Sequence, residues 1–218
     1  MCGRFALHHH PEVVALAFGL AEPPQFSARY NIAPMSSVLI VRADAEGARS
    51  AAQARWGLLP RWAKDAKLAA KMNNARAESV AEKPSFREAY RRRRCLMPAS
   101  GFYEWHAEGG RKQPWYIHPR GAALFGFAAL WERWQGPQGT LETCAIITTE
   151  ANEVMRPIHE RMPVVLEPVD YARWLDCRSD HDVGELLRPC DAEMIGAAKV
   201  STAVNNARNE SASLIEPL

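Results

Sequence analysis

Cys2 is the residue with the most distinctive chemistry in this 218-residue chain. Methionine is normally trimmed when the next side chain is small, and loss of Met1 would give Cys2 a free α-amine beside its thiol. Such a 1,2-aminothiol captures an aldehyde twice, because the amine (pKa about 8) forms an imine and the thiol (about 8.5) then closes a thiazolidine ring. The alternative is that Cys2 is only a small residue that begins a strand.

Two further segments carry groups that could move protons. In residues 101–105 the alternation of a strand sets Glu104 among aromatic side chains, where desolvation would raise the pKa of its carboxyl group. In residues 155–163 a loop between prolines carries His159, and histidine exchanges protons near pH 7. The alternatives are a glutamate that faces water and a histidine with a structural role.

Amide-rich segments occur at residues 73–78 and 204–209. The first contains Asn74, Arg76 and a carboxylate, and it is equally compatible with a helix cap. The second is compatible with an ordered C-terminal turn in which the amides bind backbone groups.

Composition excludes several classes of protein. A net charge of +2 does not by itself imply a polyanionic partner, and the excess of Arg (21) over Lys (6) would suit phosphate binding but also follows from a GC-rich coding sequence. The five cysteines are scattered without a C-x-x-C pair, so we expect reduced thiols, no metal site and no cofactor. Without a run of 18 apolar residues or a secretory signal, we expect a cytoplasmic protein with no membrane partner.

The elements that would position these groups are mostly strands. Helices are expected at residues 11–20, 85–92 (capped by Ser85), 168–176 and 182–187. Strands are expected at residues 37–42, 52–56, 95–97, 101–106, 114–118, 123–131, 141–148 and 199–202, with a hairpin turn at 108–111 and a loop at 135–139. This pattern predicts one α+β domain with a curved, barrel-like and mainly antiparallel sheet flanked by short helices.

Taken together, the motifs resemble those of the SRAP (SOS response-associated peptidase) family of abasic site processing proteins. The matching segments are MCGRF (1–5), YNIAP (30–34), RWGL (55–58), NARAE (74–78), CLMPA (95–99), GFYEW (101–105), IHERMP (158–163) and VNN (204–206). They extend almost from end to end, so the resemblance implies a single SRAP domain over residues 1–218.

The resemblance implies a protein that links itself covalently and reversibly to abasic sites in single-stranded DNA and so shields the lesion. In this reading Cys2 is the nucleophile, Asn74 positions the sugar, and Glu104 and His159 transfer protons. We expect a monomer that associates with the nucleoid when bound to DNA. Removal of its own Met1 would be a peptidase activity, and reversal of the link a lyase-like one.

The resemblance also implies the DNA contacts. Arg4, Arg76 and Arg161 should bind flanking phosphates, while Pro34 and Trp62 should stack against bases. A second aromatic often follows this tryptophan in the family, whereas Ala63 stands here. Residues 65–71 form an extra stretch before Asn74.

Two other functions fit the same residues. In a thiol hydrolase, Cys2 would attack an amide carbonyl with His159 as the base. In a non-covalent DNA-binding module, the arginines would hold phosphates and Cys2 would be incidental.

Overall fold

The fold is built on a closed ring of five strands. The computed structural model describes residues 2–137, 139–178 and 182–218. Each strand of the ring pairs with two neighbours in the cyclic order β4, β3, β6, β9, β10 and back to β4. The pairs are antiparallel except β4 with β10. The ring consists of β3 (Ser37–Ala43), β4 (Arg49–Trp56), β6 (Arg94–Ala99), β9 (Phe125–Gly136) and β10 (Gly139–Glu150).

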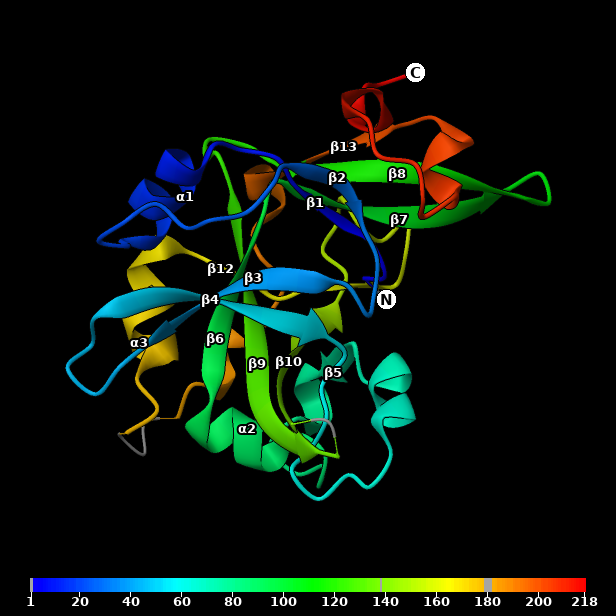
Figure 1. The fold of residues 1–218 in the computed structure, drawn as a ribbon. Coiled ribbons are helices and arrows are strands. Elements are labelled where there is room, and N and C mark those ends of the chain that lie inside the picture. The colour runs from blue at the N-terminus through cyan, green and yellow to red at the C-terminus, as the bar shows by residue number, and fades with distance from the viewer. Residues whose placement is uncertain (1, 138, 179–181) are drawn as a thin grey trace.

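Short strands extend this barrel, and a second sheet lies against it (Figure 1). The extensions are β5 (Asn74–Arg76) and β11 (Arg161–Pro163) on β10, and β12 (Val165–Leu166) on β9. The second sheet has the order β13 (Ile195–Lys199), β8 (Arg111–Pro119), β7 (Gly101–Glu108), β1 (Phe5–Leu7) and β2 (Arg29–Ile32). The predicted α+β class with a barrel-like, mainly antiparallel sheet is therefore confirmed.

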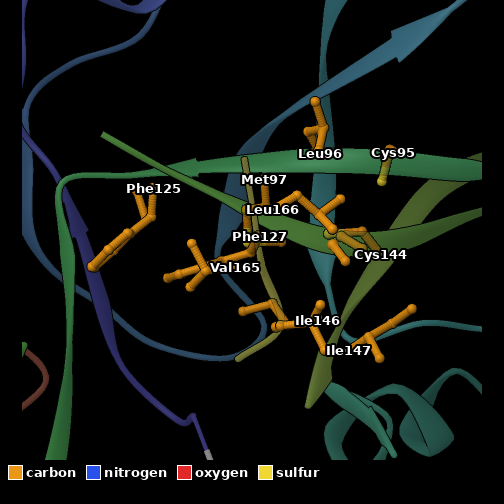
Figure 2. Packing of buried hydrophobic residues seen from close by; sticks show 14 of the residues in the cluster. Cys95, Leu96, Met97, Phe125, Phe127, Cys144, Ile146, Ile147, Val165 and Leu166 are labelled. Carbon is orange, nitrogen blue, oxygen red and sulfur yellow. The ribbon is translucent and has the colours of Figure 1, made fainter. Parts of the chain in front are cut away.

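The core fills the barrel and fixes the strands that carry the polar motifs. Figure 2 shows side chains of β6, β9, β10 and β12 packed together, and burying each such side chain contributes roughly 1.5 to 3 kcal/mol. At the edge of this core, Phe5 packs edge-on against Trp56 with ring centroids 5.2 Å apart. The buried Trp56 donates its indole N–H to the carbonyl oxygen of Asn73 at 2.8 Å. Trp56 therefore contacts both the N-terminal segment, at Phe5, and the segment before β5, at Asn73.

The helices are shorter than the sequence pattern predicts. They are α1 (Pro11–Phe18), α2 (Arg87–Arg92) and α3 (Tyr171–Leu175). The first helix, predicted to end near residue 20, ends at Phe18, because Gly19 adopts a left-handed conformation (φ 63°) and its N–H closes the last turn. Ser85 does not cap α2, whose N-cap position is Phe86. In the described residues no helix has the length and apolar character needed to cross a membrane.

Several expected elements are replaced by 3-10 turns. Residues 182–187 form only a 3-10 turn because the Asp182 carboxylate accepts the Gly184 N–H at 2.8 Å. The last strand ends at Lys199 rather than spanning 199–202, since the Ser201 hydroxyl caps the next turn. The 3-10 helices are η1 (Ala66–Lys71), η2 (Ala77–Ser79), η3 (Pro168–Asp170), η4 (Gly184–Leu186), η5 (Ala192–Met194), η6 (Thr202–Asn205) and η7 (Ala212–Ile215).

The turn predictions had mixed outcomes. The hairpin between β7 and β8 is confirmed, and Gly109 and Gly110 have the positive φ values (56° and 78°) that its tight turn requires. The loop predicted at residues 135–139 is shorter, because Gly136 and Gly139 already pair within β9 and β10; residue 138 lies outside the described residues. The alternative of a helix cap at residues 73–78 is wrong, since Asn74 lies in β5.

Candidate functional site

Cys2 and Asn74 meet although they lie 72 positions apart in the sequence. The Asn74 side-chain N–H donates to the carbonyl oxygen of Cys2 at 2.7 Å, and Cys2 is fully buried. The other amide atom, Asn74 Oδ1, is buried without a hydrogen-bond partner among the described residues. Asn74 therefore holds the Cys2 backbone with one atom and keeps an acceptor available with the other.

The Cys2 thiol keeps its proton at neutral pH. Burial raises its pKa, and the negative charge of Glu104 raises it further. Its sulfur lies 3.9 Å from the carbonyl oxygen of Arg4, which is a weak contact. The thiol is therefore not a preformed thiolate, and Glu104 lies close enough to influence it.

Glu104 and His159 face each other from β7 and from the loop before β11. Their nearest atoms, Glu104 Oε2 and His159 Nε2, are 4.0 Å apart. The predicted effect of the aromatic strand on Glu104 is confirmed, because burial raises the pKa of its carboxyl group while the charge of His159 opposes that rise. His159 Nδ1 lies 2.9 Å from the backbone N–H of Arg161, which donates to it, and 3.3 Å from the Arg161 carbonyl oxygen. The backbone thus holds the Nδ1 side of the ring, and Nε2 is the ring nitrogen nearest to Glu104.

Both groups line an open pocket of about 540 Å³ together with Trp105, Lys112 and Asn205. Sequence reasoning placed Trp105 and Asn205 only within motifs and missed Lys112. The β7–β8 register was the available signal, because Lys112 pairs with Ala107, which shares a face of the strand with Trp105. The pocket therefore contains one cation besides the acid and the imidazole.

The three arginines expected to bind phosphate have different surroundings. Arg76 is exposed on β5 and forms no ion pair within the described chain. Arg161 is paired through both terminal nitrogens with Glu78, at 2.6 and 3.1 Å. Arg4 donates to the side-chain oxygen of Asn31 at 2.6 Å. Only Arg76 presents a guanidinium without an internal acceptor.

The two expected stacking residues lie at the surface. Trp62 is 59% exposed, and its indole N–H donates to the carbonyl oxygen of Pro84 at 3.4 Å. Pro34 is half-buried in the turn between β2 and β3, beside the exposed Met35, which has a positive φ of 72°. Within the described residues no three His, Cys, Asp or Glu side chains gather closely enough to hold a metal ion.

Comparison with known proteins assigns the family. Residues 1–207 match the family model described as SOS response associated peptidase (SRAP). The chain belongs to the SRAP family. Similar curated proteins include abasic site processing protein YoqW of Bacillus subtilis (strain 168), 42% identical with 99% of each chain covered. Another is abasic site processing protein HMCES of Gallus gallus, 34% identical, covering 89% of this chain and 67% of that protein.

A solved structure shares the SRAP fold described above. A protein from Bacteroides thetaiotaomicron superimposes with a TM-score of 0.88 at 26% identity, and each chain is covered completely. The two chains therefore share the arrangement of barrel and second sheet.

One residue of the SRAP motifs has a positioning role that sequence reasoning did not assign. Asn31 is 1% exposed, accepts the Arg4 guanidinium and donates from Nδ2 to three carbonyl oxygens at 2.9 to 3.3 Å. These oxygens belong to Val204, Asn206 and Asn209. From β2, Asn31 thereby connects Arg4 near the N-terminus to residues 204–209. Its place in the motif at residues 30–34 was the only signal in the sequence.

Proposed function

We propose that the protein, once Met1 has been removed, binds single-stranded DNA at an abasic site and joins itself to the lesion through a thiazolidine on Cys2. Membership of the SRAP family and the names of its curated relatives support processing of abasic sites in DNA. The observation that carries the finer proposal is the contact of Asn74 with Cys2 beside the buried Glu104. The link would shield the lesion from strand cleavage during the response to DNA damage.

The first step is opening of the sugar. An abasic deoxyribose is mostly a closed hemiacetal, so its ring oxygen must gain a proton while the anomeric hydroxyl loses one. His159 and Glu104 suit this exchange as a pair, because Nε2 and Oε2 lie 4.0 Å apart in the pocket. The protonated ring would give its Nε2 proton to the ring oxygen, the Glu104 carboxylate would take the proton of the anomeric hydroxyl, and transfer of that proton to His159 would restore both groups. The product is the free aldehyde at C1′.

The second step joins the Cys2 amine to the aldehyde. The amine nitrogen bonds to C1′ and gives up two protons in turn through Glu104: the first goes to the carbonyl oxygen, and the second goes to the resulting hydroxyl, which leaves as water. A carboxyl group with a raised pKa suits both halves of this exchange. Asn74 Oδ1, which has no hydrogen-bond partner among the described residues, would accept an N–H of the reacting nitrogen.

The third step closes the ring. The thiol sulfur adds to the imine carbon, and the thiol proton passes to the nitrogen, so no atom is lost. Because burial keeps the thiol protonated, the amine reacts first and the sulfur second. Closure removes the imine that would otherwise promote β-elimination, and the reverse of the same steps would release the DNA.

The DNA strand is proposed to follow the exposed groups around this pocket. Arg76 would contact a phosphate directly. Arg4, bound to Asn31, and Arg161, bound to Glu78, would attract the DNA phosphates through their positive charge. Trp62 and Pro34 would support unstacked bases, which favours single strands over duplex.

The alternatives are less well supported. A thiol hydrolase needs a thiolate, whereas burial raises the pKa of the Cys2 thiol. A purely non-covalent arginine clamp needs several available guanidinium groups, whereas Arg4 and Arg161 are bound internally. Removal of Met1, either by the protein itself or by an aminopeptidase, must precede any chemistry at the Cys2 amine.

We also propose that residues 1–218 act as one domain and as a monomer. Support comes from the C-terminal segment, whose Glu210 carboxylate accepts backbone N–H groups of Tyr30 and Asn31 in β2 at 2.8 to 3.1 Å. Both ends of the chain thereby contribute to the same sheet.

The deciding experiment is a denaturing gel of the protein mixed with a single-stranded oligonucleotide that contains one abasic site. Protein whose intact mass shows loss of Met1 should give a shifted band that survives heating in detergent. Cys2→Ala should give no stable band, because it lacks the ring-closing sulfur. A wild-type protein without Met1 that gives no shifted band would overturn the proposed function.

Two controls separate the chemical steps. Cys2→Ser keeps the amine but not the thiol, so its imine should appear on the gel only after borohydride reduction. Cys177→Ser changes a half-buried thiol far from Cys2 in the sequence and should crosslink as the wild type does. An undiminished band from Cys2→Ser without borohydride would exclude the thiazolidine.

A further inference from the structure

A second hollow, of about 570 Å³, is formed by residues 62–71, which precede Asn74 in the chain. Its lining consists of Trp62, Ala63, Lys64, Asp65, Lys67, Leu68 and Lys71. Three of the six lysines in the whole chain are therefore gathered within eight residues. In Figure 1 this segment contains the cyan helical turn η1.

The hollow carries a positive charge that the described residues do not neutralise. Within the described chain Lys64, Lys67 and Lys71 form no ion pair. The one carboxylate, Asp65, is engaged as the cap of η1, where it accepts the Lys67 backbone N–H at 2.8 Å. The hollow therefore presents three cations against one anion, which suits a polyanion with closely spaced charges.

The floor beneath these cations is rigid. Leu59, Ala63, Ala69 and Trp134 form a small buried cluster, and the Trp134 indole N–H donates to the Ala63 carbonyl oxygen at 2.7 Å. The two ends of the loop are tied together, because the Leu58 N–H donates to the Met72 carbonyl oxygen at 3.0 Å. The lysines consequently project from a fixed surface rather than from a free loop.

The hollow is close to the reactive residues. Lys71 is three residues from Asn74, so their Cα atoms are at most about 11 Å apart. Asn74 in turn contacts Cys2. Trp62 lies at the other end of the lysine segment with its ring 59% exposed. A single DNA strand that leaves the pocket past Lys71 would pass the lysines and then reach the exposed ring of Trp62.

We infer that this lysine hollow is a binding site for the backbone phosphates of the single-stranded DNA that flanks the lesion. Lysine binds phosphate as a point charge, and an exposed indole supports an unstacked base, whereas duplex DNA keeps its bases covered. The inference rests on the proposed function, since it assigns the path of the strand that carries the abasic site. It adds a contact surface that does not touch the reacting atoms.

Salt dependence of binding tests the inference. Fluorescence anisotropy would measure the affinity of the full chain for an undamaged 15-nucleotide single strand between 50 and 200 mM salt. In Lys64→Gln/Lys67→Gln/Lys71→Gln the slope of log K against log salt should fall by about 2, at roughly 0.7 per phosphate contact. The wild type should therefore lose roughly 20-fold more affinity than the variant over this range. An unchanged slope would overturn the inference.

The matched control removes the same charge elsewhere. Arg173→Gln/Arg178→Gln/Lys199→Gln changes three exposed basic residues on α3, after α3 and on β13, and should keep the wild-type slope. If both triple variants change the slope equally, general charge rather than the hollow is responsible and the inference fails. Trp62→Ala should weaken binding at an unchanged slope, because stacking releases no counterions.

Crosslinking separates this inference from the proposed function. At 50 mM salt and saturating protein, the lysine variant should still crosslink fully to an abasic oligonucleotide. On a three-nucleotide substrate with the lesion in the middle, its rate should equal that of the wild type. A rate deficit on that short substrate would overturn the inference, whereas absence of crosslinking by the wild type would overturn the proposed function alone.

Discussion

At the scale of single residues, the site combines the Cys2 thiol, which stays protonated, with the Glu104 carboxyl group, whose ionisation is shifted to higher pH. Burial is the first cause of both effects, and the charge of Glu104 also raises the pKa of Cys2. A carboxyl group with a raised pKa gives up and regains its proton closer to neutral pH than an exposed one. In the proposed reaction Glu104 would use this property to accept and return protons.

Replacement of Glu104 should change the pH dependence of crosslinking. In the wild type the rate should rise with pH as Glu104 ionises and the Cys2 amine, with a pKa of about 8, becomes neutral. Glu104→Gln keeps the size of the side chain but cannot accept a proton, so the rate should fall about 100-fold and the acid limb due to Glu104 should disappear. Rates measured by gel from pH 5 to 9 check this, and an unaltered profile would remove Glu104 from the chemistry.

The same substitution has a predicted sign for stability. The folded pKa of Glu104 is raised above its unfolded value of about 4.3. The stability that the protonated side chain contributes is therefore fully present below the unfolded pKa and is lost as pH rises through the folded pKa. Glu104→Gln should thus gain stability relative to wild type as pH rises through this interval. Thermal melts of both proteins at pH 4.5 and 8 measure the difference, and a gain at the lower pH instead would contradict the assigned burial cost.

The environments of individual residues were only partly predictable from the sequence. The raised pKa of Glu104 followed from neighbouring aromatics in the same strand, which is local information. The contact of Asn74 with Cys2 and the pairing of Arg161 with Glu78 join residues 72 and 83 positions apart. Nothing local specifies such partners, so the internal engagement of Arg161 was not foreseen.

At the scale of elements, the long strands position the acid and the short ones position the nucleophile. Alternation predicted most of the long strands because several apolar positions repeat in each. The strands β1, β2, β5, β11 and β12 have two to four residues, too few to show a period. Four of them pair with a long strand, and β2 pairs with β1. Cys2 precedes β1 and Asn74 begins β5, so the elements nearest the nucleophile were the ones missed.

The strand that carries Glu104 depends on a glycine at its start. A Cβ at Gly101 would lie 2.4 Å from the Tyr116 hydroxyl and 2.5 Å from the Ile117 carbonyl oxygen on the paired strand β8. Gly101→Ala should therefore destabilise the protein by about 1 to 3 kcal/mol and displace Glu104. Both the free energy of unfolding in urea and the crosslinking rate should fall.

The control for this prediction lies in the same hairpin. Gly110 has φ 78° with nothing within 4 Å of an added Cβ, and asparagine tolerates that backbone conformation. Gly110→Asn should change stability by less than about 1 kcal/mol and leave crosslinking intact. Equal losses in both variants would mean that the hairpin as a whole, rather than the close approach at Gly101, limits activity.

At the scale of the whole molecule, the C-terminal segment completes the surface around the N-terminal residues. Asn205 accepts the Trp105 indole N–H at 2.6 Å, and the Val204 carbonyl oxygen accepts the Arg4 guanidinium at 2.9 Å. Figure 1 shows the red C-terminal turns beside the sheet that contains β1 and β2. The asparagine-rich sequence indicated an ordered turn, but its partners could not be read from it, because they lie about 100 to 200 positions away.

Glu210 is the residue through which this closure can be tested. Its carboxylate accepts the backbone N–H groups of Tyr30 and Asn31 in β2, which pairs only with β1 among the described strands. Glu210→Ala would leave the more buried Asn31 N–H unsatisfied, at a cost of about 1 to 3 kcal/mol, or roughly 2 to 10 °C in Tm. Because Asn31 also holds Arg4, affinity for single-stranded DNA should fall together with Tm. Glu193→Ala, which removes an exposed carboxylate without an ion pair in the described chain, should leave both unchanged, and a Glu210→Ala protein with wild-type Tm would show that the two ends of the chain are not coupled.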